Sequence, residues 1–209
     1  MKVFILAAGK SSRISRITGQ AIKPLLPISD GGESIISRTV RQCHSRHHTP
    51  TIVTRGEIAS YFSHLPADIF ISPSHATTCN TLLSTSNLWD DDRTVILLGD
   101  VVYARDAMDM IFSSCDPFLI LGDEFEIYAL SFGSRSYEKI KIAAETGSEH
   151  IFGKLRYLAR AYYGIDTSSD DPALLKHMTP LPFGGATMDV DTPEQYRQLY
   201  FTTHKRLKE

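Results

Sequence analysis

The chain has 209 residues, of which 42% are hydrophobic and 22% charged, and its formal net charge is −2. This composition is enough for a core, so we expect a single domain over residues 1–209 and not a disordered polymer. The near-neutral charge argues against a protein that coats nucleic acid, because that requires a basic face. No apolar run reaches the length of about 18 residues that spans a membrane. The apolar N-terminal stretch is too short for a secretory signal. We therefore expect a cytoplasmic protein that has neither nucleic acid nor a membrane as a partner.

Short apolar runs alternate with helical patterns along the first two thirds of the chain. The runs predict strands over residues 3–6, 52–53, 69–71, 95–98, 118–121 and 127–132. Apolar residues at helical spacing predict helices over residues 35–43, 58–62, 82–89 and 108–115. This alternation predicts an α/β fold: a Rossmann-like three-layer sandwich with a mainly parallel central sheet and helices on both sides.

The last third of the chain follows this alternation less well. Charged and aromatic residues in segment 134–171 predict an inserted specificity region with a strand over residues 162–166. Lys154, Arg156 and Arg160 are expected to form a basic face there, either solvated or binding an anion. Further on, Thr192-Pro193-Glu194-Gln195 combines an N-cap, a first-turn proline and a capping-box partner, which predicts a C-terminal helix.

Three cysteines, Cys43, Cys79 and Cys115, are far apart in the sequence and lack the spacing of a metal site. Such usage is typical of a protein from a reducing compartment. We expect all three to be reduced thiols in the core.

The loop after the first predicted strand, residues 7–23, has the composition of a phosphate-binding loop. Small residues allow backbone N–H groups to approach phosphate oxygens, and the arginine and lysine side chains supply a planar fork and a compact cation. These residues are Gly9, Ser11, Ser12, Arg13 and Lys23. The patterns GxxxxGK[ST] and GxGxxG are both absent. The alternative is a flexible polar loop whose cations are only solvated.

Two acidic positions are candidate metal ligands. Asp100 directly follows the apolar run 95–98, at the sheet edge where ligands bind in open α/β folds. A carboxylate about 4 Å from a phosphate charge would be repelled by roughly 4 kcal/mol unless a cation lay between them, and Mg²⁺ suits one or two carboxylates. Asp189 and Asp191 are the second candidates, and Asp191 has the alternative role of favouring the helix that follows.

A resemblance to a known family connects these positions. Leu6-Ala7-Ala8-Gly9-x-Ser11-x-Arg13, followed by Lys23-Pro24-Leu25, resembles the LAAGxGxR…KPL signature of nucleotidyltransferases of the sugar-phosphate and phosphocholine cytidylyltransferase type. The resemblance implies the nucleotide-diphospho-sugar transferase fold. It implies that Arg13, Lys23 and Asp100 are catalytic and that Asp100 with Asp189 or Asp191 binds Mg²⁺. The nucleotide-binding residues that it implies are Leu6, Ala7, Ala8, Gly9, Ser11, Ser12, Arg13, Lys23 and Asn80.

Asn80 is included because Asn80 to Ser84 resembles a helix start that lines the nucleotide pocket in this family; ordinary capping of that helix is the alternative. The function expected is therefore Mg²⁺-dependent transfer of a nucleoside monophosphate from a nucleoside triphosphate to a phosphorylated small acceptor, such as a sugar phosphate or a phosphocholine-like molecule, with release of pyrophosphate. An isoprenoid-type or molybdenum-cofactor-type transferase remains an alternative. So does a non-catalytic nucleotide-binding or regulatory module. The residues leave several nucleobases as alternatives, and both a monomer and a homo-oligomer are compatible with the sequence.

Overall fold

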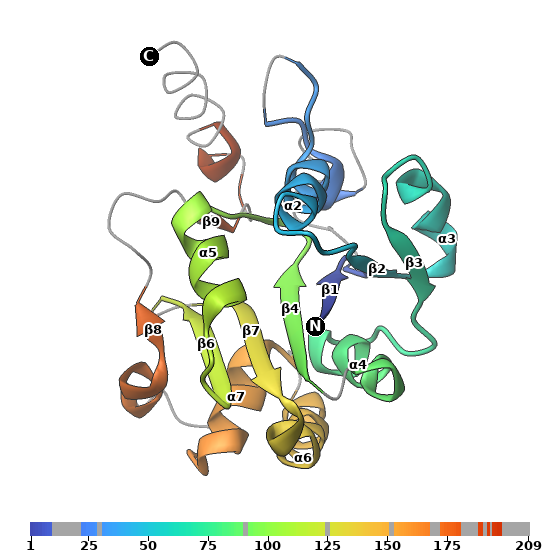
Figure 1. Cartoon of the computed structure of the whole chain (residues 1–209). Helices are drawn as coiled ribbons and strands as arrows, with labels where there is room; N and C mark the ends of the chain where they lie inside the picture. The colour runs from blue at the N-terminus through green and yellow to red at the C-terminus, as the bar shows by residue number, and fades with distance from the viewer. Residues whose placement is uncertain are drawn as a thin grey trace.

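The centre of the protein, in a computed structural model, is a seven-stranded sheet in the order β3-β2-β1-β4-β7-β6-β8 (Figure 1). Because β7 alone pairs antiparallel with its neighbours β4 and β6, the other six strands share one direction. A mainly parallel sheet, as expected, is confirmed. The strands are β1 (Lys2–Leu6), β2 (Thr51–Thr54), β3 (Asp68–Ile71), β4 (Arg93–Leu98), β6 (Phe118–Gly122), β7 (Ile127–Gly133) and β8 (Thr179–Pro180).

The structure describes residues 1–9, 22–28, 31–89, 92–123, 126–150, 153–167, 172–180, 188–189, 192 and 194–197. A second sheet pairs β5 (Val101–Val102) with β9 (Met188–Asp189). The α-helices are α2 (Ile35–His44), α3 (Gly56–Ala59), α4 (Thr78–Leu83), α5 (Arg105–Ser113), α6 (Tyr137–Glu149) and α7 (Leu155–Tyr163). Short 3₁₀ segments are η1 (Lys23–Leu25), η2 (Ser60–Phe62), η3 (Ser86–Leu88), η4 (Ser134–Ser136) and η5 (Pro172–His177).

Alternation along the strands produces two cores, one on each face of the sheet. In β1, Val3 and Ile5 are buried in a core with α2, α3 and α5, while Phe4 and Leu6 are buried in a second core with α4, α6 and α7. Successive side chains of a strand point to opposite faces, so a continuous apolar strand requires helices on both sides. The three-layer arrangement predicted from the sequence is confirmed.

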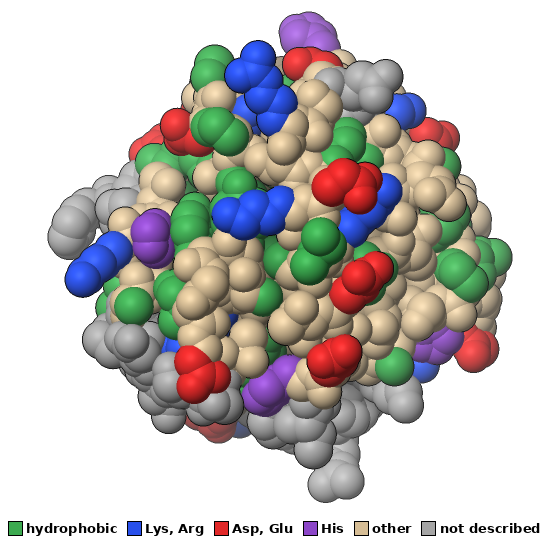
Figure 2. Space-filling model, turned by 90° about the horizontal axis from the view of Figure 1, so that it is seen from below, with side chains coloured by type: hydrophobic (Ala, Val, Ile, Leu, Met, Phe, Trp, Pro, Cys, Tyr) green, Lys and Arg blue, Asp and Glu red, His purple; other side chains and the backbone are tan. Residues whose placement is uncertain are grey.

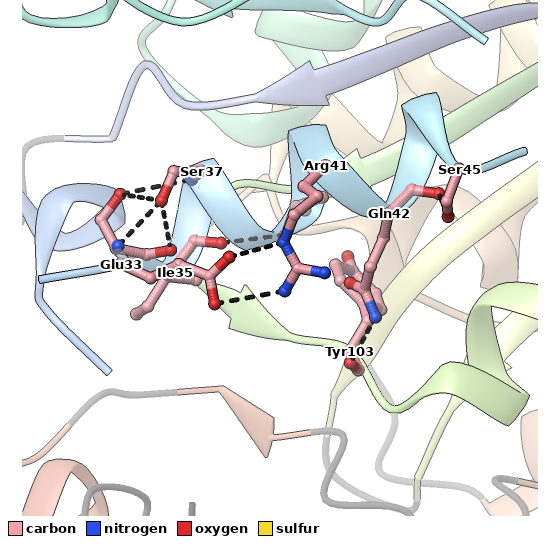
Figure 3. Close-up of polar contacts among 9 residues, drawn as sticks. Glu33, Ile35, Ser37, Arg41, Gln42, Ser45 and Tyr103 are labelled. Carbon is pink, nitrogen blue, oxygen red and sulfur yellow. Dashed lines mark hydrogen bonds and ion pairs between the residues drawn. The ribbon is translucent and has the colours of Figure 1, made fainter. Parts of the chain in front are cut away.

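Helix α2 begins with a capping box, in which Ser34 Oγ accepts from the Ser37 N–H and Ser37 Oγ accepts from the Ser34 N–H. Figure 3 shows two further contacts of this helix: Arg41 pairs with Glu33 on the outer side, and Gln42 donates to the backbone oxygen of Tyr103 at 3.1 Å. The capping box fixes the residue at which the helix starts. The hydrogen bond from Gln42 connects the helix to Tyr103, the residue that follows β5.

Tyr103 joins the ends of two strands from inside the core. Its side chain is fully buried, its hydroxyl accepts from the Leu98 N–H at 2.7 Å, and it donates to the Tyr128 carbonyl oxygen at 2.6 Å. The end of β4 is therefore held beside the start of β7 by one phenolic oxygen.

We expect Tyr103→Phe to lower the free energy of unfolding by about 1–3 kcal/mol, because the buried Leu98 N–H loses this acceptor. Urea denaturation measures the change. Tyr61→Phe is the matched control: Tyr61 is 55% exposed, and its change should stay within about 0.5 kcal/mol. Equal effects of the two substitutions would show that the hydrogen bonds of the Tyr103 hydroxyl contribute nothing to the free energy of unfolding.

The segment 134–171 forms regular structure that the sequence analysis did not predict. Helices α6 and α7 pack on each other and on the sheet, and the buried residues of that contact include Ile140, Ala144 and Leu158. The strand predicted over residues 162–166 is wrong, because α7 continues to Tyr163 and ends at Gly164, whose φ is 70°. A role of this segment in specificity stays a prediction.

The three cysteines differ in environment. Cys43 and Cys79 are fully buried, and burial raises the pKa of each thiol to about 12. Cys115 is exposed and lies beyond the end of α5, so its placement in the core, and on the face of that helix, was wrong.

A thiol reagent should therefore separate these cysteines. We expect one equivalent of a disulfide reagent to react quickly with the native protein at pH 8 and three to react in urea, because buried, protonated thiols are poor nucleophiles. Cys115→Ser should remove the fast reaction. A second fast equivalent in the native protein would contradict this assignment.

The described residues near the end of the chain are tied to the residues that follow the candidate phosphate loop. Thr192 and Gln195 form the predicted capping box, and residues 194–197 are helical. Tyr196 packs against a small cluster that includes Leu26 and Val102, and its hydroxyl donates to the Pro27 carbonyl oxygen at 2.7 Å. This part of the C-terminal helix is confirmed.

The edge of the sheet opposite the carboxyl end of β4 has a mixed surface. Figure 2 shows acidic and basic side chains interspersed with neutral and apolar ones over the described part of this face. Among the described residues, no helix combines the length and the apolar character that crossing a bilayer demands.

Candidate active site

The carboxyl ends of β1, β2 and β4 meet closely. The Gly99 N–H donates to the Leu6 carbonyl oxygen at 2.9 Å, and the Ala7 N–H donates to the Val53 carbonyl oxygen at 2.8 Å. A Cβ at Gly99 would lie 3.0 Å from both Ala7 Cβ and the Leu6 oxygen. Glycine at this position therefore allows the chain leaving β4 to run directly against the chain leaving β1.

An ion pair joins the two sides of this junction. Lys23 Nζ donates to Asp100 Oδ2 at 2.9 Å, and the lysine side chain is 7% exposed whereas the aspartate side chain is 31% exposed. Lys23 begins η1, in which Pro24 occupies the first turn. Two predicted site residues that are 77 positions apart are thus in direct contact, with the carboxylate partly open to solvent.

The second acidic segment reaches the same place through the small sheet. Val101, the residue after Asp100, pairs antiparallel with Asp189. Directly opposed Cα atoms in such a pair are about 4.5–5.5 Å apart. The backbone of Asp189 therefore lies opposite that of Val101, one residue after Asp100, and Asp191 falls outside the described residues.

The other predicted nucleotide contacts are placed only in part. Ala7 and Ala8 are buried at the end of β1, and Gly9 is exposed. Asn80 lies in the first turn of α4, where its N–H donates to Thr77 Oγ1 at 3.1 Å and its Oδ1 accepts from the same hydroxyl at 2.8 Å. This is the capping role that the sequence analysis left as the alternative. Ser11, Ser12 and Arg13 fall outside the described residues.

A further charged group at this edge was not predicted. Glu126 directly precedes β7 and forms an ion pair with Lys154, the residue before α7. The predicted basic face of Lys154, Arg156 and Arg160 is wrong, because Arg160 is 1% exposed and donates to the Asp166 carbonyl oxygen at 2.9 Å. Sequence alone gave no signal for the pair, because Glu126 lies in a turn and Lys154 follows an unpredicted helix.

The donor set at the junction fits a hard divalent cation. Among the described residues, no three His, Cys, Asp or Glu side chains form a metal-binding group. Mg²⁺, however, usually takes one or two protein carboxylates and completes its shell with waters and phosphates. Asp100 presents a partly exposed carboxylate that is paired with the Lys23 ammonium group. The Asp189 backbone lies opposite Val101, the residue that follows Asp100.

The fold and this edge define a nucleotide-binding α/β domain, in which ligands lie beyond the carboxyl ends of the strands. A family model described as the MobA-like NTP transferase domain matches residues 3–146, more than half of the chain. The chain therefore belongs to this family and is a nucleotidyltransferase.

Solved structures show the same fold. A protein described as a glucose-1-phosphate thymidylyltransferase from Bacillus anthracis, in complex with sucrose, is 17% identical with a TM-score of 0.64, over 97% of this chain and 95% of that one. A UDP-glucose pyrophosphorylase complexed with UDP-glucose is 12% identical with a TM-score of 0.65, over 98% of both chains. A UDP-glucose pyrophosphorylase from Acinetobacter baumanii is 11% identical with a TM-score of 0.60, over 96% of this chain and 92% of that one. A search of curated proteins found no match.

Proposed function

We propose that this nucleotidyltransferase moves a nucleoside monophosphate from a nucleoside triphosphate to a phosphorylated small acceptor, in a Mg²⁺-dependent reaction that releases pyrophosphate. The observation that carries the proposal is the contact between Lys23 and Asp100, with the backbone of Asp189 opposite the next residue, Val101. A cation for phosphate and carboxylates for a metal are the two groups that a metal–triphosphate complex needs.

In this reaction a phosphate oxygen of the acceptor attacks the α-phosphorus of the triphosphate. The bond between the α-phosphorus and its bridging oxygen breaks, and that oxygen leaves with pyrophosphate. Lys23 and Arg13 hold the leaving phosphates and stabilise the charge that develops on them. Because the acceptor supplies the nucleophile, the chain needs no covalent intermediate. The main work of its residues is to position the two reactants.

Asp100, together with Asp189 or Asp191, holds Mg²⁺ in this proposal. When bound, the ion would neutralise phosphate charge and act as a Lewis acid. In the structure Lys23 is paired with Asp100, so this carboxylate does not face the phosphates as a bare anion.

The acceptor is a sugar phosphate or a phosphocholine-like molecule. The solved structures of similar fold include proteins named for glucose-1-phosphate and UDP-glucose, which supports the first class. The family match keeps the molybdenum-cofactor type as the alternative.

The test is to incubate the protein with each of the four nucleoside triphosphates, Mg²⁺ and a panel of phosphorylated acceptors, and to follow pyrophosphate release and ³¹P spectra. Release that needs both the acceptor and Mg²⁺ is the expected result. Tight nucleotide binding without release from any acceptor would instead support a non-catalytic, regulatory module.

A further inference from the structure

Asp100 lies in a short turn whose two ends are joined by the last side chain of the turn itself. The turn consists of residues 98–103, from the last residue of β4 to the residue after β5. The Tyr103 hydroxyl reaches back to the first of these residues: it accepts from the Leu98 N–H at 2.7 Å and lies 3.3 Å from the Leu98 carbonyl oxygen. Because Asp100 lies between these two residues, the position of its backbone depends on this closure.

The same hydroxyl also attaches the turn to a neighbouring strand. It donates to the carbonyl oxygen of Tyr128, on β7, at 2.6 Å, and the Tyr103 side chain is fully buried in the core on the α2 side of the sheet. A hydroxyl can donate one hydrogen bond and accept others, so one oxygen atom serves both strands. A phenylalanine ring would occupy the same space but would leave the Leu98 N–H without this acceptor.

Two helices hold the far end of the turn. From α2, Gln42 Nε2 donates to the Tyr103 carbonyl oxygen at 3.1 Å, and Gln42 is 8% exposed (Figure 3). Helix α5 begins two residues after Tyr103, at Arg105, and buries Ala107 and Met108 in the same core. The turn is therefore fixed at both ends by elements that are themselves packed.

This closed turn determines where both described acidic candidates lie. Asp100 accepts from Lys23 and keeps its side chain 31% exposed at the ligand edge of the sheet. The next residue, Val101, pairs with Asp189. A change in the closure of the turn would therefore move Asp100 and the strand that pairs with Asp189 together.

We propose that Tyr103 is a positioning residue for metal binding: its hydroxyl holds the turn that presents the Asp100 carboxylate to Mg²⁺, and Gln42 supports the same turn from α2. Mg²⁺ requires nearly ideal octahedral geometry, so a carboxylate that is free to shift binds it less tightly. Residues that orient a metal ligand commonly contribute about 10-fold to 100-fold to metal affinity. Tyr103 acts through the backbone of the turn and touches neither reactant. This inference rests on the proposed function and extends it to the residues that position its metal ligand.

The test is the affinity of the intact protein for Mn²⁺, a cation with the same preference for carboxylate and water ligands. Water-proton relaxation measures the bound Mn²⁺ in the presence of each of the four nucleoside triphosphates, without acceptor. We expect Tyr103→Phe to weaken Mn²⁺ binding by about 10-fold or more. In EDTA, the affinity for the nucleotides should stay within about 3-fold, because a carboxylate does not attract a triphosphate when no metal lies between them.

Tyr137→Phe is the matched control. The Tyr137 hydroxyl lies 3.2 Å from Thr94 Oγ1, near the opposite end of the same strand, β4, so the variant should leave the Mn²⁺ affinity unchanged. Gln42→Met removes the donor to the Tyr103 carbonyl oxygen and tests the turn independently, from α2. We expect it to weaken Mn²⁺ binding by about 3-fold to 10-fold. Urea denaturation establishes that each variant is folded, and Gln42→Met decides the outcome if Tyr103→Phe is not.

An unchanged Mn²⁺ affinity in Tyr103→Phe, or an equal loss in Tyr137→Phe, would overturn the inference. So would an equal loss of nucleotide affinity in EDTA, because it would indicate a general distortion of the site. Asp100→Asn separates these failures from a failure of the proposed function. If Asp100→Asn loses Mn²⁺ binding while Tyr103→Phe retains it, only the positioning role is wrong. If Asp100→Asn binds Mn²⁺ as tightly as the unmodified protein, the metal site of the proposed reaction is wrong, and the positioning role with it.

Discussion

Asp100→Asn is expected to reduce turnover by at least about 10³-fold at saturating Mg²⁺, because a neutral amide holds a hard cation far less strongly than a carboxylate does. The shape of the side chain is kept, and the amide oxygen can still accept from Lys23 Nζ. We therefore expect the free energy of unfolding to fall by no more than about 2 kcal/mol. Initial rates of pyrophosphate release across a Mg²⁺ titration, together with urea denaturation, measure the two effects.

Asp109→Asn is the matched control for this experiment. Asp109 also accepts from a basic side chain, Arg46, at 2.5 Å, but it lies on α5 and not among the strand ends. It should retain near-normal turnover. Full activity of Asp100→Asn, or an equal loss in both variants, would remove Asp100 from the metal site.

Gly153→Ala is expected to destabilise the protein by about 2–5 kcal/mol. The backbone at Gly153 has φ +45°, which a side chain disfavours by about 1–2 kcal/mol. A Cβ there would also overlap the Thr77 side chain, and such overpacking adds about 1–3 kcal/mol. The overlap falls on the N-cap of α4, so this helix is expected to lose its first turn. Urea denaturation measures the loss.

Gly164→Ala separates the two contributions. Gly164 also has positive φ, 70°, yet nothing lies within 4 Å of its added Cβ. It should therefore show only the backbone effect of about 1–2 kcal/mol. In the Gly153→Ala background, Thr77→Gly should recover part of the loss although it removes the cap, because it removes Thr77 Cβ, the atom nearest to the added Cβ. If Gly153→Ala and Gly164→Ala are equally stable, crowding against Thr77 is unimportant.

The sequence predicted the inner strands of the sheet well because they are covered on both faces. A run such as Val3 to Leu6 has no polar residue on either side, which leaves few alternatives to a buried strand. The same reasoning placed Asp100 correctly, because the carboxyl ends of parallel strands share one edge. Lys23 lies at that shared edge as well, and there it contacts Asp100.

Helix α6, in the second helical layer, could not be predicted, for a physical reason. The buried side of α6 consists largely of small residues such as Ala143, Ala144 and Gly147, and Ile142 on the same helix is 63% exposed. Gly147 permits close packing, since a Cβ there would lie 2.8 Å from the Leu158 nitrogen. Apolar periodicity is weak in such a helix, whereas its packing is tight. Cys115 was misplaced because α5 ends at Ser113, two residues before it.

Which buried side-chain nitrogens lack a hydrogen-bond partner, as Arg55 Nε does, is set by the fold and cannot be seen in a single sequence. Whether a guanidinium nitrogen is satisfied depends on the acceptors that the fold brings near it. The register that pairs Val101 with Asp189 is likewise set by tertiary packing, because each of these strands has only two residues.

That pairing has a consequence for the order of folding. It joins positions 101 and 189, and closing so long a chain segment is slow compared with forming local helices. During refolding, the fluorescence of Trp89, which is buried against Phe132 and Tyr137, should recover with the main core, while catalytic competence lags behind it. The protein would then pass through a compact, inactive intermediate that becomes active when β9 pairs with β5.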